Sequence, residues 1–363
     1  MKKVAIVYLI WSDEPKKYLV RALNAVVAQT YPKTDLHLLV IYNSHKPEEV
    51  SQLPFVQEEV NKRKGQSLQA TVLPQEINLG FSGGNNLGMH WAIDNGFDYV
   101  FLHNADGYLA PRAISEMVKA MESDSKIGQA QALMLLHPEQ HLVNTTGNSL
   151  HYLNIGYCGD FRKPISEQKL AAVYDVGYVS GGATLMRTDL LKKFGLWHEE
   201  FFMYHEDTEY SLRLKVRGYR TVTVRDAIFY HEYEFSKSIQ KFFWIERNRH
   251  VLKYLFYRWP TIILTLPLEV LYNIGLLIVA LKDGWARELL KVYHYWLQPK
   301  NWRTWKELRK KNLEERLLSD RALITWAEHT VEMADVVVPV PIKLLADAVF
   351  TIYYYFLKIV VWW

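Results

Sequence analysis

Apolar segments of strand length alternate with segments of helical character through the first hundred residues, and this alternation constrains the fold most strongly. Strands are expected at Val4–Trp11, Leu36–Tyr42, Val72–Leu73 and Phe97–Leu102, and helices from Pro15 to Gln29 and from Asn85 to Asn95. The alternation predicts an α/β fold, a mainly parallel sheet with helices on both faces. Ligands of such sheets bind at the carboxyl ends of the strands, so the turns after Trp11, Tyr42 and His103 are candidate sites.

The 363-residue chain has the composition of a folded protein and a single cysteine. Hydrophobic residues make up 49% and charged residues 23%, which excludes wholesale disorder and a polytopic membrane protein. Cys158 alone cannot form an intramolecular disulfide or a cysteine-built zinc site, as suits a reducing compartment. The net charge of +4 is too small to indicate a nucleic-acid partner. The apolar N-terminal run lacks a cleavage site and is interpreted as a buried strand, not as a signal peptide.

The character of the chain changes after Tyr257, so we expect one domain at residues 1–257 and a helical region at residues 258–363. Two apolar stretches, Trp259–Leu281 and Ile342–Trp363, flank a basic segment with interleaved tryptophans at residues 300–316. Such a segment can be a solvated face, a nucleic-acid contact or an interfacial membrane helix, and the apolar flanks favour the membrane. Glu269, Asn273 and two helix-interrupting prolines oppose a crossing, so helices lying in the membrane plane are predicted. The alternative is a helical subdomain packed on the domain or on another subunit.

Two polar clusters follow predicted strands. The segment NLGFSGGNNLG, residues 78–88, has glycines that let backbone amides approach a phosphate or a sugar. A tight connection between strand and helix would explain these glycines equally well. Asn104 and Asp106, in HNADG, can direct their oxygens at a hard cation or a ribose hydroxyl, although an acidic turn after a strand is often only a turn.

A third cluster, FFMYHEDTEYSLRLKVRGYR at residues 201–220, places Asp207 and Glu209 at the start of a helix that ends at Gly218. Acids there cap the helix and complement its dipole. The preceding aromatic residues also predict the partial desolvation that suits a general base, and spacing leaves both interpretations open. His231, after a strand at Arg220–Tyr230, is as a lone histidine more typical of a structural residue than of a ligand.

The ordered set of these segments resembles glycosyltransferase family 2, inverting enzymes with the GT-A fold. The resemblance covers about residues 3–250, and its pieces are the first strand and its turn, QTYP at 29–32, NLGFSGGNNLG, HNADG, VSGGATLMRTDLLKKFG at 179–195, and HED before RLKVRGY. The chain resembles most the branch of rhamnosyltransferases and galactofuranosyltransferases of bacterial cell-surface glycans. The implied fold is GT-A, a Rossmann-like and mainly parallel sheet, followed here by the helical membrane-associating region.

The resemblance implies roles for individual residues. Asp207 matches the catalytic base, and Asp106 and His231 match ligands of a divalent cation, Mg²⁺ or Mn²⁺. The residues expected to contact the donor, a dTDP- or UDP-sugar, are Trp11, Asn43, Gly83, Gly84, Asn85, Asn104, Asp106 and Arg247. Gly181, Gly182 and Glu206 match the acceptor side.

Two departures from the family pattern affect these expectations. Tyr42, followed by Asn43, stands where the family commonly has an aspartate, which leaves recognition of the nucleobase open. Asn104 replaces the first acid of the family's Asp-x-Asp motif, which leaves Asp106 as the main cation ligand.

The implied reaction is a direct displacement at an anomeric carbon, with Asp207 taking the proton of the acceptor hydroxyl. The expected acceptor is a glycan, in particular one linked to polyprenyl diphosphate. The expected location is the cytoplasmic face of the cell membrane, as a peripheral, monotopic protein, because the donor is cytosolic and basic segments stay inside. A catalytically idle GT-A scaffold protein and a nucleotidyltransferase are the alternatives. No nucleic-acid partner is expected, and the sequence leaves homo-oligomer formation open.

Overall fold

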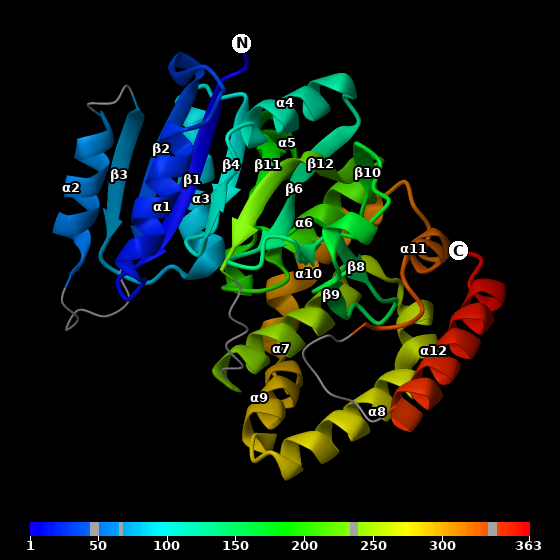
Figure 1. Ribbon diagram of the computed structural model, residues 1–363. Coiled ribbons are helices and arrows are strands. Elements are labelled where there is room, and N and C mark those ends of the chain that lie inside the picture. The colour runs from blue at the N-terminus through cyan, green and yellow to red at the C-terminus, as the bar shows by residue number, and fades with distance from the viewer. Residues whose placement is uncertain (44–50, 65–67, 233–238, 333–339) are drawn as a thin grey trace. The chain divides into compact units, whose positions relative to one another are not determined.

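A computed structural model describes residues 1–43, 51–64, 68–232, 239–332 and 340–363 (Figure 1). The chain divides into two compact units. The sheet unit comprises residues 1–148, 158–207 and 219–234, and the helical unit comprises residues 149–157, 208–218 and 235–363. The helical unit therefore includes segments that precede the predicted region 258–363, and the boundary at residue 257 stays a prediction.

The sheet unit is built on a ten-stranded mixed sheet with the order β10-β12-β6-β11-β4-β1-β2-β3, in which β5 pairs with β12 and β7 with β6. The strands are β1 (Val4–Trp11), β2 (Leu36–Asn43), β3 (Gln69–Gln75), β4 (Tyr99–His103), β5 (Gly107–Leu109), β6 (Ile127–Leu136), β7 (Val143–Thr145), β10 (Val173–Asp175), β11 (Ala183–Arg187) and β12 (Arg220–His231). The pairs β1–β2, β1–β4, β2–β3 and β6–β12 are parallel, and β11 is antiparallel to both β4 and β6. The predicted α/β fold with a mainly parallel sheet is confirmed.

Helices cover both faces of this sheet, as alternate residues of β1 show. Ile6 and Tyr8 belong to a core shared with α1 (Lys16–Val27), α2 (Leu53–Lys64) and α4 (Ala113–Ser123). Val7 and Leu9 point the other way, toward α3 (Gly80–Asp94), beside which lies α5 (Thr188–Phe194). A strand buried on both faces is apolar throughout rather than alternating, as the β1 sequence VAIVYLIW is.

Short elements complete the sheet unit and its margins. They are the 3₁₀ turns η1 (Lys33–Asp35), η2 (Ile165–Glu167) and η3 (Glu199–Phe201), and the short strands β8 (Asn148–Leu150) and β9 (Gly156–Cys158).

The main local difference from the sequence prediction is the length of α3. This helix begins at Gly80 rather than at Asn85, so the predicted glycine loop is helical. Glycine disfavours helices in isolation, but a Cβ added to Gly84 would lie 2.6 Å from Leu9, and the missing side chain lets α3 approach β1. Four strands also differ in extent: β2 includes Asn43, β3 has seven residues, β4 starts at Tyr99, and β12 includes His231.

The helical unit contains most of the C-terminal chain. Its helices are the latter part of α6 (Glu206–Lys215), α7 (Ile239–Phe256), α8 (Trp259–Lys282), α9 (Ala286–Leu297), α10 (Pro299–Glu315), α11 (Asp320–Trp326) and α12 (Val340–Val360). The predicted interruption of α8 by prolines is wrong. Pro260 lies in the first turn, where no amide donor is needed, and the helix continues through Pro267. By length and composition alone, α8 and α12 are long and apolar enough to cross a membrane.

The packing of α3 on β1 yields a stability prediction. A Cβ at Gly88 would lie 2.3 Å from Cγ1 of Val7, which is fully buried in a central strand of the sheet. We expect Gly88→Ala to lower the free energy of unfolding by about 1–3 kcal/mol in urea denaturation, despite the better helix propensity of alanine. Gly275→Ala is the control, because apart from the adjacent residues and the backbone of its own helix no atom of the described residues lies within 4 Å of the added Cβ. Equal effects of the two substitutions would contradict the packing argument.

Candidate active site

The carboxyl ends of β4 and β12 bring Asp106 and His231 together. His231 Nε2 lies 2.9 Å from Asp106 Oδ1, and the amide of the Asn104 side chain donates to the same oxygen at 2.9 Å. On the other side of the ring, His231 Nδ1 lies 3.1 Å from Asn144 Oδ1. Burial acts to raise the pKa of Asp106, but the facing His231 and hydrogen bonds to the carboxylate hold that pKa below its usual value. Asp106 is therefore a carboxylate at neutral pH.

This pair fits part of a metal site. Asp106 offers a carboxylate oxygen on a side chain that is 33% exposed, and His231 offers an imidazole nitrogen. Within the described residues, no group of three or more His, Cys, Asp or Glu side chains is arranged to hold a metal ion. Two protein ligands suit a divalent cation that takes its other ligands from a phosphate-bearing substrate. The predicted ligand pair thus lies together, and its role stays a prediction.

Asp207, in the first turn of α6, is connected to this pair by two glycines. The Gly181 backbone amide donates to Asp207 Oδ2 at 2.9 Å, and the Gly182 carbonyl accepts from the Asn104 backbone amide at 2.8 Å. A Cβ at Gly181 would lie 2.8 Å from the Trp197 ring, so a side chain there would displace the segment. One short segment thus places the candidate base and the candidate metal ligands around a common site.

The backbone before Asp207 is strained. Phe202, Tyr204 and His205 have φ values of 63°, 65° and 67°. Non-glycine residues in this left-handed region cost about 1–3 kcal/mol each and persist where neighbouring structure enforces them. The enforcing contact is at the N-terminus of α3, where the amides of Phe81 and Ser82 donate to the Phe202 carbonyl at 2.7 and 3.1 Å.

The same contacts correct the prediction for the glycine-rich segment. The first amides of a helix need acceptors from outside the helix, and here the protein supplies them. Besides the two amides bound to Phe202, the Leu79 amide donates to Asn43 Oδ1 and the Gly80 amide to Asn78 Oδ1. Asn43 is fully buried, and its own amide group donates to the Gly80 carbonyl at 3.2 Å. The amides of residues 79–82 therefore have their hydrogen-bond partners within the protein, and they are not available to a phosphate or a sugar.

Gly83, Gly84 and Asn85 are buried inside α3. The Asn85 side chain donates to the Phe81 carbonyl within the same helix at 2.9 Å. These positions serve the packing and internal bonding of α3, and their contact with a donor stays a prediction.

Two further predicted donor contacts lie in different places. Trp11 is the half-buried last residue of β1, paired in register with Asn43. Arg247 belongs to α7 in the helical unit, where its guanidinium carbon lies 4.7 Å from the Trp244 ring and 5.1 Å from the Tyr295 ring. Cation–π contacts of this kind attract the guanidinium to the aromatic rings within the helical unit. A phosphate contact of Arg247 stays a prediction.

Glu206 is a buried acid directly beside Asp207. Its side chain is 3% exposed, and Oε2 has no hydrogen-bond partner among the described residues. Burial, followed by the charge of Asp207, raises the pKa of Glu206 well above its usual value. Glu206 is therefore held in its neutral form. Glu209, the other acid of this helix, is fully buried and pairs with Arg213 one turn later, which is a structural role.

Sequence reasoning missed Asn86 and Trp197. The Asn86 side chain donates to the Trp197 carbonyl at 2.8 Å and accepts from the Trp197 amide at 3.2 Å. The Trp197 ring also stacks on Phe81, and it limits the space at Gly181. The only available signal was the doubled asparagine in GGNNLG, which a helix interior does not favour without a specific partner.

The fold and these residues together describe an enzyme with a carboxylate at the start of a helix and a candidate cation pair at the sheet edge. Residues 4–252 match the family described as Glycosyltransferase like family 2. The match covers more than half of the chain, and this chain belongs to glycosyltransferase family 2. The predicted family and enzyme class are confirmed, whereas the narrower resemblance to rhamnosyl- and galactofuranosyltransferases stays a prediction.

Solved structures of glycosyltransferases are similar to this chain. GalNAc-T7, crystallised with UDP, GalNAc and Mn²⁺, has a TM-score of 0.56 and 14% identity over 71% of this chain and 49% of its own. Residues 1–349 of S. aureus TarS in complex with UDP have a TM-score of 0.47 and 17% identity over 69% of this chain and 65% of theirs. The mannosyltransferase PcManGT from Pyrobaculum calidifontis, in complex with GDP-Man and Mn²⁺, has a TM-score of 0.49 and 12% identity. The similarity covers 99% of this chain and 84% of PcManGT.

The chain spans about half the length of GalNAc-T7, and at 14% identity that similarity shows the fold alone. No curated protein matches the chain.

The neutral state of Glu206 predicts a pH-dependent stability. The folded pKa is raised, so the folded state keeps a proton that the unfolded chain loses above its ordinary pKa of 4.5, and this contribution to stability falls as pH rises. Glu206→Gln removes the titration. We expect the thermal midpoint of this variant, relative to the unsubstituted chain, to increase between about pH 5 and about pH 8. The exposed Glu200→Gln is the control, and a pH-independent difference for Glu206→Gln would contradict the assignment.

Proposed function

We propose that this chain transfers a sugar from a nucleoside-diphosphate sugar to an acceptor hydroxyl, with inversion at the anomeric carbon and Asp207 as general base. The observation that carries the proposal is the hydrogen-bonded path from Asp207 through Gly181–Gly182 to Asn104 and Asp106, with contacts of 2.9, 2.8 and 2.9 Å. Membership of glycosyltransferase family 2 supports it. The GalNAc-T7 structure, which contains UDP and Mn²⁺, supports a nucleotide-bearing donor and a divalent cation.

In this mechanism the Asp207 carboxylate takes the proton of the acceptor hydroxyl as its oxygen attacks the anomeric carbon and the bond to the diphosphate breaks. The Gly181 amide fixes the orientation of the carboxylate through Oδ2. Glu206 is neutral and does not compete for the proton. A single displacement inverts the configuration, whereas retention by double displacement would need a second acid on the opposite face of the sugar.

The residues at the end of β4 and β12 are proposed to serve the leaving group. When bound, Mg²⁺ or Mn²⁺ neutralises the charge that grows on the departing diphosphate. Asp106 and His231 hold the cation, Asn104 orients the Asp106 carboxylate, and Asn144 orients the His231 ring.

The proposed acceptor is a glycan linked to polyprenyl diphosphate, bound on the side of Gly181, Gly182 and Glu206, and the proposed donor is a dTDP- or UDP-sugar. The protein is proposed to work as a peripheral protein at the cytoplasmic face of the cell membrane. The apolar helices α8 and α12 support an acceptor that resides in a membrane.

The product formed from the donor distinguishes this function from the two alternatives. Incubation with a panel of sugar nucleotides and Mn²⁺ is expected to release a nucleoside diphosphate. Release of pyrophosphate would indicate a nucleotidyltransferase, and no release with any donor would indicate an idle scaffold protein.

Substitution of the base tests the mechanism directly. We expect Asp207→Asn to lower the transfer rate about 10²–10⁴-fold, because an amide cannot accept the proton. Donor affinity, measured by calorimetry, is expected to change little, because the amide is nearly isosteric. Asp226→Asn, at a surface ion pair with Arg225, is the control and should keep full activity. A rate for Asp207→Asn above about a third of the control rate would exclude Asp207 as the base.

Substitution of the proposed ligands tests the cation. We expect Asp106→Ala to raise the Mn²⁺ concentration needed for half-maximal activity about 10–100-fold, and His231→Ala to raise it less. EDTA is expected to inhibit the unsubstituted enzyme, and added Mn²⁺ or Mg²⁺ to restore it. Full activity in chelator would leave Asp106 with a structural or ribose-binding role only.

A further inference from the structure

The exposed large hydrophobic side chains of the described residues are concentrated in the helical unit. Among the described residues before Trp259, the exposed ones are Met1, Ile77 and Tyr204. On α8, Ile263, Leu266, Val270, Ile274 and Ile278 are between 50% and 63% exposed. Their spacing of three or four residues places them on one face of the helix. On α12, Leu345, Ile352, Phe356 and Ile359 form a second exposed row. Soluble proteins rarely expose apolar rows of this length to water, and such surfaces are typical of sites that bind a partner or a membrane.

Each helix has a different, buried face on its other side. On α8 this face carries Thr261, Thr265, Leu268 and Glu269. On α12 it carries Tyr354 and Leu357. The Tyr353 hydroxyl of α12 donates to the Leu264 carbonyl of α8, and the indole of Trp363, which follows α12, donates to the Thr261 hydroxyl.

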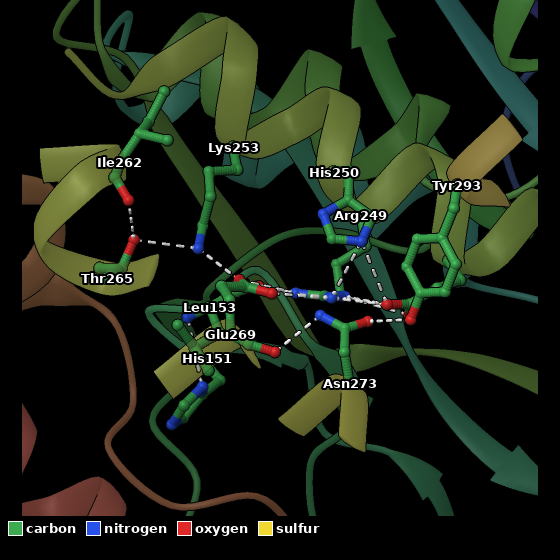
Figure 2. Close-up of polar contacts among 11 residues, drawn as sticks. His151, Leu153, Arg249, His250, Lys253, Ile262, Thr265, Glu269, Asn273 and Tyr293 are labelled. Atoms are coloured by element: carbon green, nitrogen blue, oxygen red, sulfur yellow. Dashed lines mark hydrogen bonds and ion pairs between the residues drawn. The ribbon is translucent and has the colours of Figure 1, made fainter. Parts of the chain in front are cut away.

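The buried face of α8 is held to α7 by an ion network (Figure 2). Arg249 donates to both carboxylate oxygens of Glu269 at 2.9 and 3.0 Å and also pairs with Glu246. Lys253 pairs with Glu269 and donates to the Thr265 hydroxyl at 3.1 Å. The four charged residues are each 5% exposed or less, and their formal charges cancel. Burial acts to raise the pKa of Glu246, but Arg249 and His250 lower it to about 2, so this carboxylate stays charged.

This network determines how α8 can meet a bilayer. A crossing helix is surrounded by lipid or by other membrane helices over its whole length. The middle of α8 is instead bound to the charged helix α7, and separating Glu269 from Arg249 and Lys253 would leave unpaired charges in an apolar medium. Between Thr261 and Glu269, lipid can therefore contact only the outer face of α8, which favours a helix that lies in the plane of the membrane over one that crosses it.

We propose that the outer faces of α8 and α12 form a lipid-binding surface that seats in one leaflet without crossing it. Charge complementarity selects a bilayer rather than a second copy of the chain as the occupant. The exposed Arg258 and Lys282 lie at the two ends of α8, where lipid headgroups would meet them, whereas Lys343 in the first turn of α12 is paired with Asp347. The inference deepens the proposed function, because it supplies the membrane contact that a lipid-linked acceptor requires.

Vesicle flotation of the full chain tests the surface. The chain is expected to float with phosphatidylcholine vesicles that contain phosphatidylglycerol. The double substitution Ile274→Asp, Ile278→Asp is expected to raise the lipid concentration for half-maximal binding at least about tenfold, since it places two charges in the apolar face. Both positions are more than half exposed, so folding is expected to be unchanged by circular dichroism. Ile77→Asp is the matched control, an exposed isoleucine outside the helical unit that should not affect binding. Binding of the double variant equal to that of the control would overturn the proposal, and so would an unsubstituted chain that ignores the vesicles and instead dimerises through this face.

A labelling experiment tests the in-plane orientation. A single cysteine is placed by Asp283→Cys, directly after α8, in a Cys158→Ser background. The chain is added to preformed vesicles and treated with a membrane-impermeant maleimide. Full labelling is expected for an in-plane helix, and protection until the vesicles are lysed would show a crossing and overturn the proposal. Release of nucleoside diphosphate is measured in the same samples. A chain that turns over donor but ignores vesicles fails this inference alone, and one that binds vesicles without turnover fails the proposed function alone.

Discussion

The Phe202 carbonyl accepts hydrogen bonds from the first amides of α3, and the position of the candidate base depends on this contact. It holds Phe202 in a left-handed conformation and thereby directs the chain into the first turn of α6, where Asp207 lies. The helix that supplies the amides is itself fixed to β1 by the close approach at Gly84 and Gly88. A series of contacts therefore connects the central strand β1 to the Asp207 carboxylate. The packing of α3 offsets the backbone strain at residues 202–205.

The candidate cation ligands come from other strands, and one short segment connects them to the candidate base. Asp106 follows β4, and His231 ends β12, so their separation is set by the sheet itself. The Gly181 amide donates to the Asp207 carboxylate, and the carbonyl of the next residue, Gly182, accepts from the Asn104 backbone amide. Trp197 packs against Gly181 and is held by Asn86 of α3. The separation of the candidate base from the candidate cation ligands is thus fixed by contacts that no single motif contains.

The strands and the family could be predicted from the sequence because both depend on local order along the chain. Continuous apolar runs predict strands buried on both faces, and HNADG and HED keep their places relative to those strands. The function of the glycines could not be predicted in this way. Glycine permits both an exposed loop and a close helix–strand contact, and the choice is made by Leu9 and Val7, more than seventy residues away. The hydrogen bond from the Leu79 amide to Asn43 could not be predicted either, because it depends on a helix start that needs an acceptor, and the donor contact of Asn43 stays a prediction.

Helix α8 shows the same limit for the helical unit. Composition alone describes it as an apolar segment of spanning length, with Glu269 as an unfavourable exception. The partners that make Glu269 acceptable, Arg249 and Lys253, come from the preceding helix and are not visible in the hydropathy of α8. Removing one partner from a buried ion pair typically costs about 3–5 kcal/mol, whereas an apolar replacement of the whole network can be neutral. The presence of the network is therefore weak evidence for net stability. The network determines which face of α8 is buried against α7 and leaves the apolar face for another surface.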